Sequence, residues 1–88
     1  MVSYSITFKP SVEKDLRRLP KEVLARVIRR IEEVRADPFP PRAVKLSGTE
    51  RLCRIRVGDY RIVYEVNTDA GEVTIYYVRH RREVYRAL

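Results

Sequence analysis

The chain has 88 residues, enough for one domain but not for a second one with a core of its own. It is 44% hydrophobic and carries only 3 glycines, which argues against a disordered chain. Its 19 basic and 12 acidic residues give a net charge of +7, which favours an anionic partner such as nucleic acid, an acidic protein or a membrane surface, although a solvated arginine-rich surface would give the same count.

The first predicted element is a half-buried strand over residues 3–8, SYSITF, where apolar and polar residues alternate. Its apolar face would consist of Tyr4, Ile6 and Phe8. Pro10 ends this strand, because proline has no amide hydrogen to donate to a sheet.

Two helices joined by a single proline follow this strand. Ser11 can cap the first helix, and Pro20 both ends it and can begin the second, which runs to about Ala36. The apolar stripe expected on the second helix consists of Val23, Leu24, Val27, Ile28, Ile31 and Val34. We expect this helical hairpin to cover one face of a sheet and to leave the other face open for function.

A three-stranded antiparallel meander is predicted for the second half of the chain. The proline-rich stretch DPFPP cannot be helical, and strands are expected over 52–57, 60–67 and 72–80. Residues 81–88 are long enough for a short C-terminal helix. Helices segregated from an antiparallel meander define an α+β fold, and we expect one such domain over residues 1–88.

Arginine recurs along the first hairpin of this meander, CRIRVGDYRIVYE. Gly58 and Asp59 form a two-residue turn with glycine first, which is consistent with type II′. A turn at this point sets the pairing of the two strands, and directly paired residues point to the same face. Arg54, Arg56 and Arg61 should therefore project together.

Like charges at paired positions of a sheet cost stability, so three arginines on one face suggest a role beyond solubility. A phosphodiester bound by several guanidinium groups would offset that cost through charge-assisted, often bidentate hydrogen bonds. The alternative is a solvated surface on which Glu65 and Asp59 pair with the arginines. Because only these two acids serve three arginines, we favour the binding interpretation.

More cations follow at the end of the last strand, namely Arg79, His80, Arg81, Arg82 and Arg86. If the last strand lies beside 60–67, its end brings Arg81 close to the arginines of the hairpin. Tyr85 in the same stretch could stack on a base, or it could pin the last helix onto the sheet.

Other chemistry is sparse in this sequence. Cys53, the single cysteine, can form neither an internal disulfide nor a cysteine-based zinc cluster, and its place in a strand predicts a buried thiol. The single histidine, His80, cannot hold a metal alone, and we expect no cofactor. No stretch approaches the roughly 18 apolar residues of a membrane span and the N-terminus does not resemble a signal peptide, so a soluble, cytoplasmic protein is expected.

Four segments stand out together: FKPSVEKDLRRLP at 8–20, KLSG at 45–48, LCRIRVGDYRIVYEV at 52–66 and VRHRREVY at 78–85. In this order they resemble the RelE-like toxins of the RelE/ParE superfamily, and the resemblance covers essentially the whole chain. It implies a toxin of a type II toxin–antitoxin system that enters the ribosomal A site, cuts mRNA and inhibits translation. The implied nucleophile is the 2′-hydroxyl of the RNA, and no metal is needed.

The resemblance also implies roles for individual residues. Arg61 would stabilise charge on the scissile phosphate, Arg81 would donate near the leaving 5′-oxygen, and Tyr85 would assist. The implied catalytic residues are Arg56, Arg61, Arg81 and Tyr85. The residues expected to bind RNA are Arg54, Arg79, His80 and Arg82.

One departure from the family leaves the general base open. The best-known members place lysine on the first hairpin strand, where this chain has Arg54 and Arg56, and arginine almost never loses its proton. His80 is an alternative base, because an unperturbed imidazole titrates near neutral pH, but it could equally cap or pack the end of the sheet.

Two other functions stay open from the sequence. One is a ParE-like, gyrase-inhibiting toxin without nuclease activity, and the other is a toxin fold that has lost its activity and binds an antitoxin. Each of the three implies a cognate RelB-like antitoxin, because a chain of charge +7 should bind an acidic, partly disordered partner that folds on contact. The ribosome and mRNA are the other implied partners, with operator DNA reached only through the antitoxin complex and no membrane.

Overall fold

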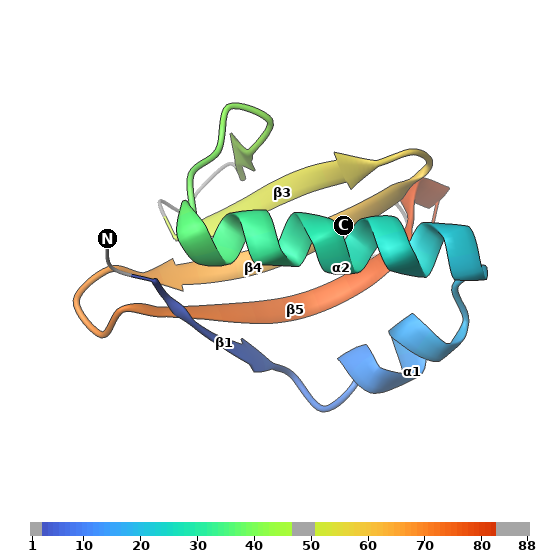
Figure 1. Ribbon diagram of the computed structural model, residues 1–88, viewed down its shortest axis with the longest axis horizontal. Helices are drawn as coiled ribbons and strands as arrows, with labels where there is room; N and C mark the ends of the chain where they lie inside the picture. The colour runs from blue at the N-terminus through green and yellow to red at the C-terminus, as the bar shows by residue number, and fades with distance from the viewer. Residues whose placement is uncertain (1–2, 47–50, 83–88) are drawn as a thin grey trace.

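The computed structural model describes residues 3–46 and 51–82 and arranges them as a five-stranded sheet with a long helix across one face (Figure 1). Its elements are β1 Ser5–Phe8, α1 Val12–Arg17, α2 Lys21–Ala36, β2 Val44–Lys45, β3 Leu52–Val57, β4 Tyr60–Asn67 and β5 Glu72–His80. The predicted α+β class is confirmed, and β3, β4 and β5 have the bounds expected from the sequence. The predicted C-terminal helix at 81–88 lies, beyond its first two residues, outside the described part of the chain. Neither helix within the described ranges is long and apolar enough to cross a membrane.

The sheet has the strand order β1-β5-β4-β3-β2, and β3, β4 and β5 form the expected antiparallel meander. β1 pairs in parallel with β5, so the start of the chain lies beside its last strand (Figure 1). A parallel pair needs a long connection, which the two helices and the rest of the meander supply. The short β2 extends the other edge by pairing antiparallel with β3. The sequence predicted neither of these edge pairings.

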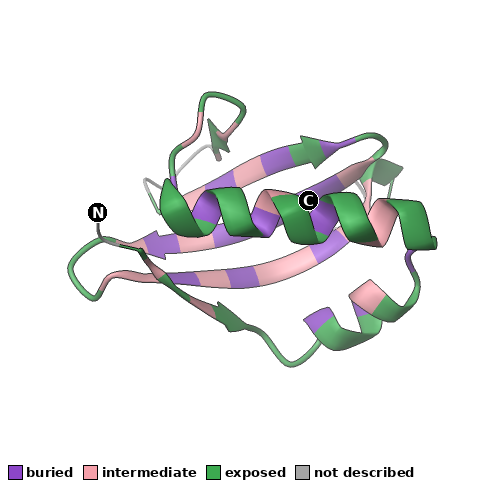
Figure 2. Ribbon diagram, in the orientation of Figure 1, coloured by how far each residue is buried: buried purple, intermediate pink, exposed green. Residues whose placement is uncertain are grey.

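The helix α2 covers the sheet with an apolar stripe (Figure 2). The residues it buries are Val27, Ile31 and Val34, as predicted. Ile28, expected in the same stripe, is 43% exposed, because the sheet covers only a narrow strip of the helix. Phe8 of β1 was also expected to be buried and is 45% exposed, whereas Tyr4 and Ile6 pack on the core.

The helix α1 lies along β5, beyond the end of β1 (Figure 1). β1 pairs with β5 only as far as Ile75. Asp15 of α1 takes over this edge, where its Oδ2 accepts a hydrogen bond from the Val78 N–H at 3.1 Å. The prediction that the helical hairpin covers one sheet face therefore holds for α2, whereas α1 lies at the edge. Ser11 precedes α1 as predicted, but without a side-chain capping hydrogen bond.

Tyr64 lies at the centre of the core, fully buried and paired with Cys53. Its hydroxyl donates a hydrogen bond to the Pro38 carbonyl oxygen at 2.9 Å and thereby ties the loop after α2 to the sheet. Burial raises the pKa of the Tyr64 hydroxyl and of the Cys53 thiol. The predicted burial of Cys53 is confirmed.

We expect Tyr64→Phe to lower the free energy of unfolding by about 1–2 kcal/mol, because the buried Pro38 carbonyl would lose its donor. Urea unfolding followed by circular dichroism measures this loss. Tyr76→Phe is the matched control, since its hydroxyl donates to Glu65 at 3.2 Å in a less buried place, and a change below about 0.5 kcal/mol is expected there. Equal losses in the two variants would contradict a special role for the Pro38 contact.

Candidate functional site

The turn between β3 and β4 has the conformation that its sequence predicts. Gly58 has a φ of 59° and Asp59 does not have a positive φ, which fits a type II′ turn. A Cβ at Gly58 would meet nothing closer than Nη1 of Arg26 at 3.6 Å, so the backbone dihedral rather than a clash requires glycine. The register that follows is the predicted one, with Arg56 opposite Arg61.

Paired residues of adjacent strands share a face, so the sheet gathers its cations on the side opposite α2. The alternate residues on the other side belong to the core, among them Ile55, Ile62 and Val78. β5 extends the cationic side, since Arg79 pairs with Arg61 and Tyr77 pairs with Val63. We call this surface the arginine face; it consists of Arg54, Arg56, Arg61, Val63, Tyr77 and Arg79. Within it, one row of arginines crosses three strands: Arg56, Arg61 and Arg79.

A β-bulge decides which residue of β5 joins this row. The register of the β4–β5 ladder shifts by one in the middle, and Tyr76 is the extra residue. In a regular ladder continued from the start of β5, Val78 would lie opposite Arg61. The bulge places Arg79 there instead.

Arg61 is the buried member of the row, with only 6% of its surface exposed. Its Nη1 donates a long hydrogen bond of 3.5 Å to the Tyr60 carbonyl oxygen, and no acid within 3–46 and 51–82 forms an ion pair with it. Arg56 is exposed and donates through Nε to the Gly58 carbonyl oxygen at 3.1 Å. On a solvated surface, Glu65 or another acid of the hairpin would pair with Arg54, Arg56 or Arg61. No such ion pair is formed among residues 3–46 and 51–82. The row thus holds a largely buried arginine that has no acidic partner in the described part of the chain, an arrangement that is costly in the isolated protein and favours the binding of an anion.

Arg79 is held from two sides. Its Nε lies 3.6 Å from Oδ1 of Asp15, a carboxylate with only 7% of its side chain exposed. Its guanidinium carbon lies 4.9 Å from the centroid of the Tyr77 ring. Burial raises the pKa of the Tyr77 hydroxyl, and the positive charges of Arg79 and Arg54 oppose that rise.

Asp15 and Tyr77 also contact this row, and neither was among the site residues predicted from the sequence. Asp15 gives a weak signal, because it is an acid on the same side of a short helix as the buried Val12. Tyr77 gives no signal in the sequence. The side of the sheet on which it lies depends on the bulge, and the alternation of apolar and polar residues in β5 does not reveal that bulge.

The end of β5 meets the hairpin turn, as the sequence suggested for Arg81. The backbone N–H of Arg81 donates to the Asp59 carbonyl oxygen at 2.7 Å. Because this hydrogen bond joins two backbone groups, it fixes the backbone position of Arg81 without involving the guanidinium group of that residue. Tyr85, a predicted catalytic residue, lies outside the described residues.

His80 lies on the other side of β5 from Arg79, opposite Tyr60. The two rings meet edge to face with their centroids 5.3 Å apart. Nδ1 of His80 accepts a hydrogen bond from the Arg82 N–H at 3.4 Å. These are contacts of a residue that packs and caps the end of the sheet, which is the alternative given above for His80.

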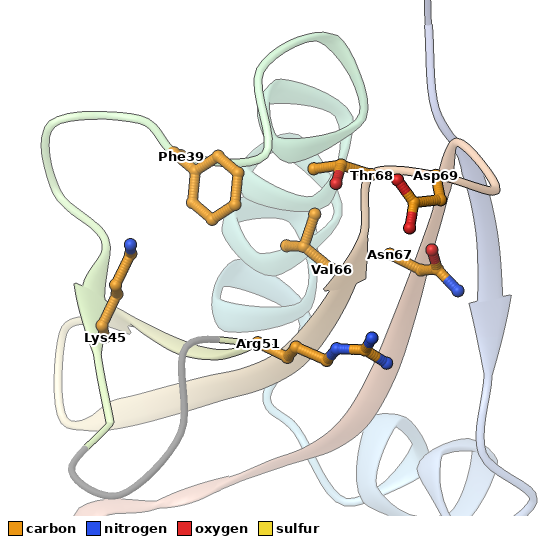
Figure 3. Close-up of a pocket in the computed structure, with 7 residues that line it drawn as sticks. All are labelled: Phe39, Lys45, Arg51, Val66, Asn67, Thr68 and Asp69. Carbon is orange, nitrogen blue, oxygen red and sulfur yellow. The ribbon is translucent and has the colours of Figure 1, made fainter.

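A separate cavity of about 270 Å³ lies at the opposite end of β4 from the hairpin turn (Figure 3). It is lined by Phe39, Lys45, Arg51, Val66, Asn67, Thr68 and Asp69. The Lys45 ammonium nitrogen lies 5.6 Å from the centroid of the Phe39 ring, on the side of the cavity away from Asp69. None of the residues predicted to be functional lines this cavity, so the arginine face is the stronger candidate site.

The fold and the arginine face define a class: compact, basic α+β domains that gather arginines on one face of their sheet. The family model described as ParE toxin of type II toxin–antitoxin system, parDE, matches residues 6–85. Toxin RelG of Mycobacterium tuberculosis is 30% identical over 87 residues, which cover 94% of this chain and 97% of that toxin. Toxin RelE3 of Methanocaldococcus jannaschii is 32% identical over 84 residues, 91% of this chain and 93% of that one.

The fold agrees with these relatives. The crystal structure of the archaeal RelE–RelB complex from Pyrococcus horikoshii OT3 contains a chain that superposes with a TM-score of 0.80 at 31% identity, over 90% of this chain and 96% of that one. The chain therefore belongs to the ParE toxin family of type II toxin–antitoxin systems and is a RelE-like toxin of the RelE/ParE superfamily.

Proposed function

We propose that this toxin cleaves mRNA on the ribosome and so inhibits translation, with the 2′-hydroxyl of the RNA as the nucleophile and without a metal ion. The observation that carries the proposal is the arginine row, in which Arg61 is buried beside like charges and has no acidic partner among the described residues. Such a site is costly without a ligand and is stabilised when a phosphate group binds. The names of the RelE relatives support the same function.

The proposed reaction is an in-line displacement at phosphorus. The 2′-oxygen attacks the adjacent phosphate, the bond from phosphorus to the 5′-oxygen breaks, and the products are a 2′,3′-cyclic phosphate and a 5′-hydroxyl end. A base takes the proton of the 2′-hydroxyl and an acid gives one to the leaving 5′-oxygen, so no further reactant is needed. Negative charge grows on the non-bridging oxygens, where guanidinium groups already fixed in place stabilise it.

Each arginine has a part in this proposal. Arg61 binds the scissile phosphate, while Arg54 and Arg56 hold the backbone beside it. Arg81 donates near the leaving 5′-oxygen from its place beside the hairpin turn. Tyr85 assists the proton transfers. The flanking RNA contacts are assigned to Arg79 and Arg82. His80, also expected from the sequence to bind RNA, is left out of this set because it packs on Tyr60 on the other side of β5.

The general base is a group other than an arginine, because a guanidinium keeps its proton at physiological pH. His80 is turned toward Tyr60 and away from the arginine face. Burial raises the pKa of the Tyr77 hydroxyl, so it stays protonated at neutral pH and suits donation to a phosphate oxygen rather than proton abstraction.

A cognate acidic antitoxin of the RelB type is part of the proposal. The related Pyrococcus horikoshii structure is a complex of RelE with RelB. A net charge of +7 suits an acidic chain that folds on contact, and we expect that chain to lay a helix on the domain and to cover residues 81–88. Contact with operator DNA would come through this complex, and action on the ribosome places the toxin in the cytoplasm.

Primer extension on an mRNA under translation in a purified system tests the proposed activity. We expect cuts within A-site codons when the toxin is present, and no cuts in the same mRNA without ribosomes. The family model is described for ParE, which makes gyrase inhibition the second candidate. Uncut mRNA, together with plasmid cleavage in the presence of gyrase, would move the assignment to a gyrase-inhibiting toxin.

A further inference from the structure

The Asp15–Arg79 ion pair joins α1 to the arginine face, and this pairing was not predicted from the sequence. We infer that Asp15 is a positioning residue of the RNA site: it holds the Arg79 guanidinium against the Tyr77 ring, so that Arg79 is a fixed hydrogen-bond donor to an RNA phosphate beside Arg61. This inference rests on the proposed binding of RNA to the arginine face.

Asp15 is itself fixed by contacts with two consecutive residues of β5. Its Oδ2 accepts from the Val78 N–H at 3.1 Å, and its Oδ1 lies 3.6 Å from Nε of Arg79. With 7% exposure the carboxylate has little water around it, so these two partners supply most of its solvation. One carboxylate thus caps the sheet edge and reaches the arginine face at the same time.

Arg79 needs such a partner because of its neighbours in the row. It is paired with Arg61, and Arg61 is paired with Arg56. Repulsion and side-chain entropy would both favour an Arg79 that extends into water. Among the residues that the structure describes, Asp15 is the one acid within ion-pair distance of this row.

Tyr77 fixes the orientation of the guanidinium group. The guanidinium carbon of Arg79 lies over the ring at 4.9 Å from its centroid, which restricts rotation about the end of the side chain. Nε faces Asp15, and the two Nη groups have no acceptor within residues 3–46 and 51–82. The Nη edge is therefore available to a tetrahedral oxyanion, and the ligand it suits is a phosphate of single-stranded RNA next to the one at Arg61.

Asp15→Asn separates placement from folding, because the amide oxygen can still accept the Val78 hydrogen bond while the charge that holds Arg79 is removed. We expect the NMR signal of the Arg79 Nε–H to move to the position of a solvated arginine. Affinity for a single-stranded RNA with a 2′-deoxy nucleotide at the cleavage position, measured by fluorescence anisotropy, should fall about 3- to 10-fold. Glu13→Gln is the matched control and should change neither readout, because Glu13 is an exposed acid of the same helix that pairs with Arg17.

The same affinity in an Arg79→Ala background decides whether Asp15 acts through Arg79. We expect Asp15→Asn to change the affinity there by less than about 2-fold. Three outcomes would each overturn the inference. The first is that Asp15→Asn lowers the RNA affinity as much in the Arg79→Ala background as it does alone. The others are an Arg79 NMR signal that does not move in Asp15→Asn, and an RNA affinity that is unchanged in Arg79→Ala alone. The NMR signal requires no RNA, so a protein that fails to cleave mRNA still gives a decisive result on the placement of Arg79.

Discussion

Replacing Arg61 with methionine is expected to remove cleavage activity without lowering the stability of the fold. Arg61 is 6% exposed and has one long hydrogen bond to Tyr60 within the described residues. Replacing this largely buried cation, which has no acidic partner among the described residues, relieves the cost of burying it beside like charges, so the free energy of unfolding should stay equal or rise by up to about 2 kcal/mol. The same change removes the proposed contact to the scissile phosphate, and cleavage should fall about 100- to 1,000-fold.

Primer extension measures the loss of cleavage, and urea unfolding measures stability. Arg56→Met is the matched control, since it makes the same substitution at the paired position, where the side chain is exposed. Its stability should change by less than about 0.5 kcal/mol, and its loss of activity should be the smaller of the two. Full activity in Arg61→Met would remove Arg61 from the site, and a loss of more than about 1 kcal/mol would show that Arg61 stabilises the fold.

Arg81→Ala should lower the rate of cleavage about 100-fold while leaving the affinity for the ribosome nearly unchanged. The proposed contribution of Arg81 is made in the transition state, where charge develops on the leaving 5′-oxygen. The backbone hydrogen bond from Arg81 to the Asp59 carbonyl oxygen survives the substitution, so the end of β5 should keep its place.

Single-turnover cleavage on stalled ribosomes separates these two quantities for Arg81→Ala. Arg42→Ala is the control, because it removes the same charge from an exposed position in the loop after α2. We expect that variant to keep its cleavage rate within about 2-fold. An Arg81→Ala toxin that binds ribosomes weakly and cleaves at the normal rate would assign Arg81 to docking rather than to chemistry.

The hairpin could be predicted residue by residue, because a two-residue turn with glycine first leaves only one register for its strands. The turn at Gly58 and Asp59 therefore predicts that Arg54, Arg56 and Arg61 lie on one face, which is the register of the structure. The order of the meander was also predictable, since short turns join neighbouring strands. The family followed from the same motifs, because they span nearly the whole chain.

The edges of the molecule were not predictable in this way. Alternation shows that β1 is a strand, but it says nothing about β5 as its partner or about the parallel direction. Phe8 and Ile28 have apolar side chains at periodic positions, and their exposure depends on how far a neighbouring element reaches. The Asp15–Arg79 contact depends on the pairing of β1 with β5 and also on where β1 ends, because α1 reaches β5 only beyond the end of β1.

The bulge at Tyr76 allows this fold to vary in length inside its sheet. A deletion in an interior strand normally turns every later side chain to the opposite face. β5 carries one residue more than its ladder with β4 uses, so losing Tyr76 would straighten the strand and leave Arg79 opposite Arg61. Related toxins can therefore differ by one residue at this point and still present the same row of charges.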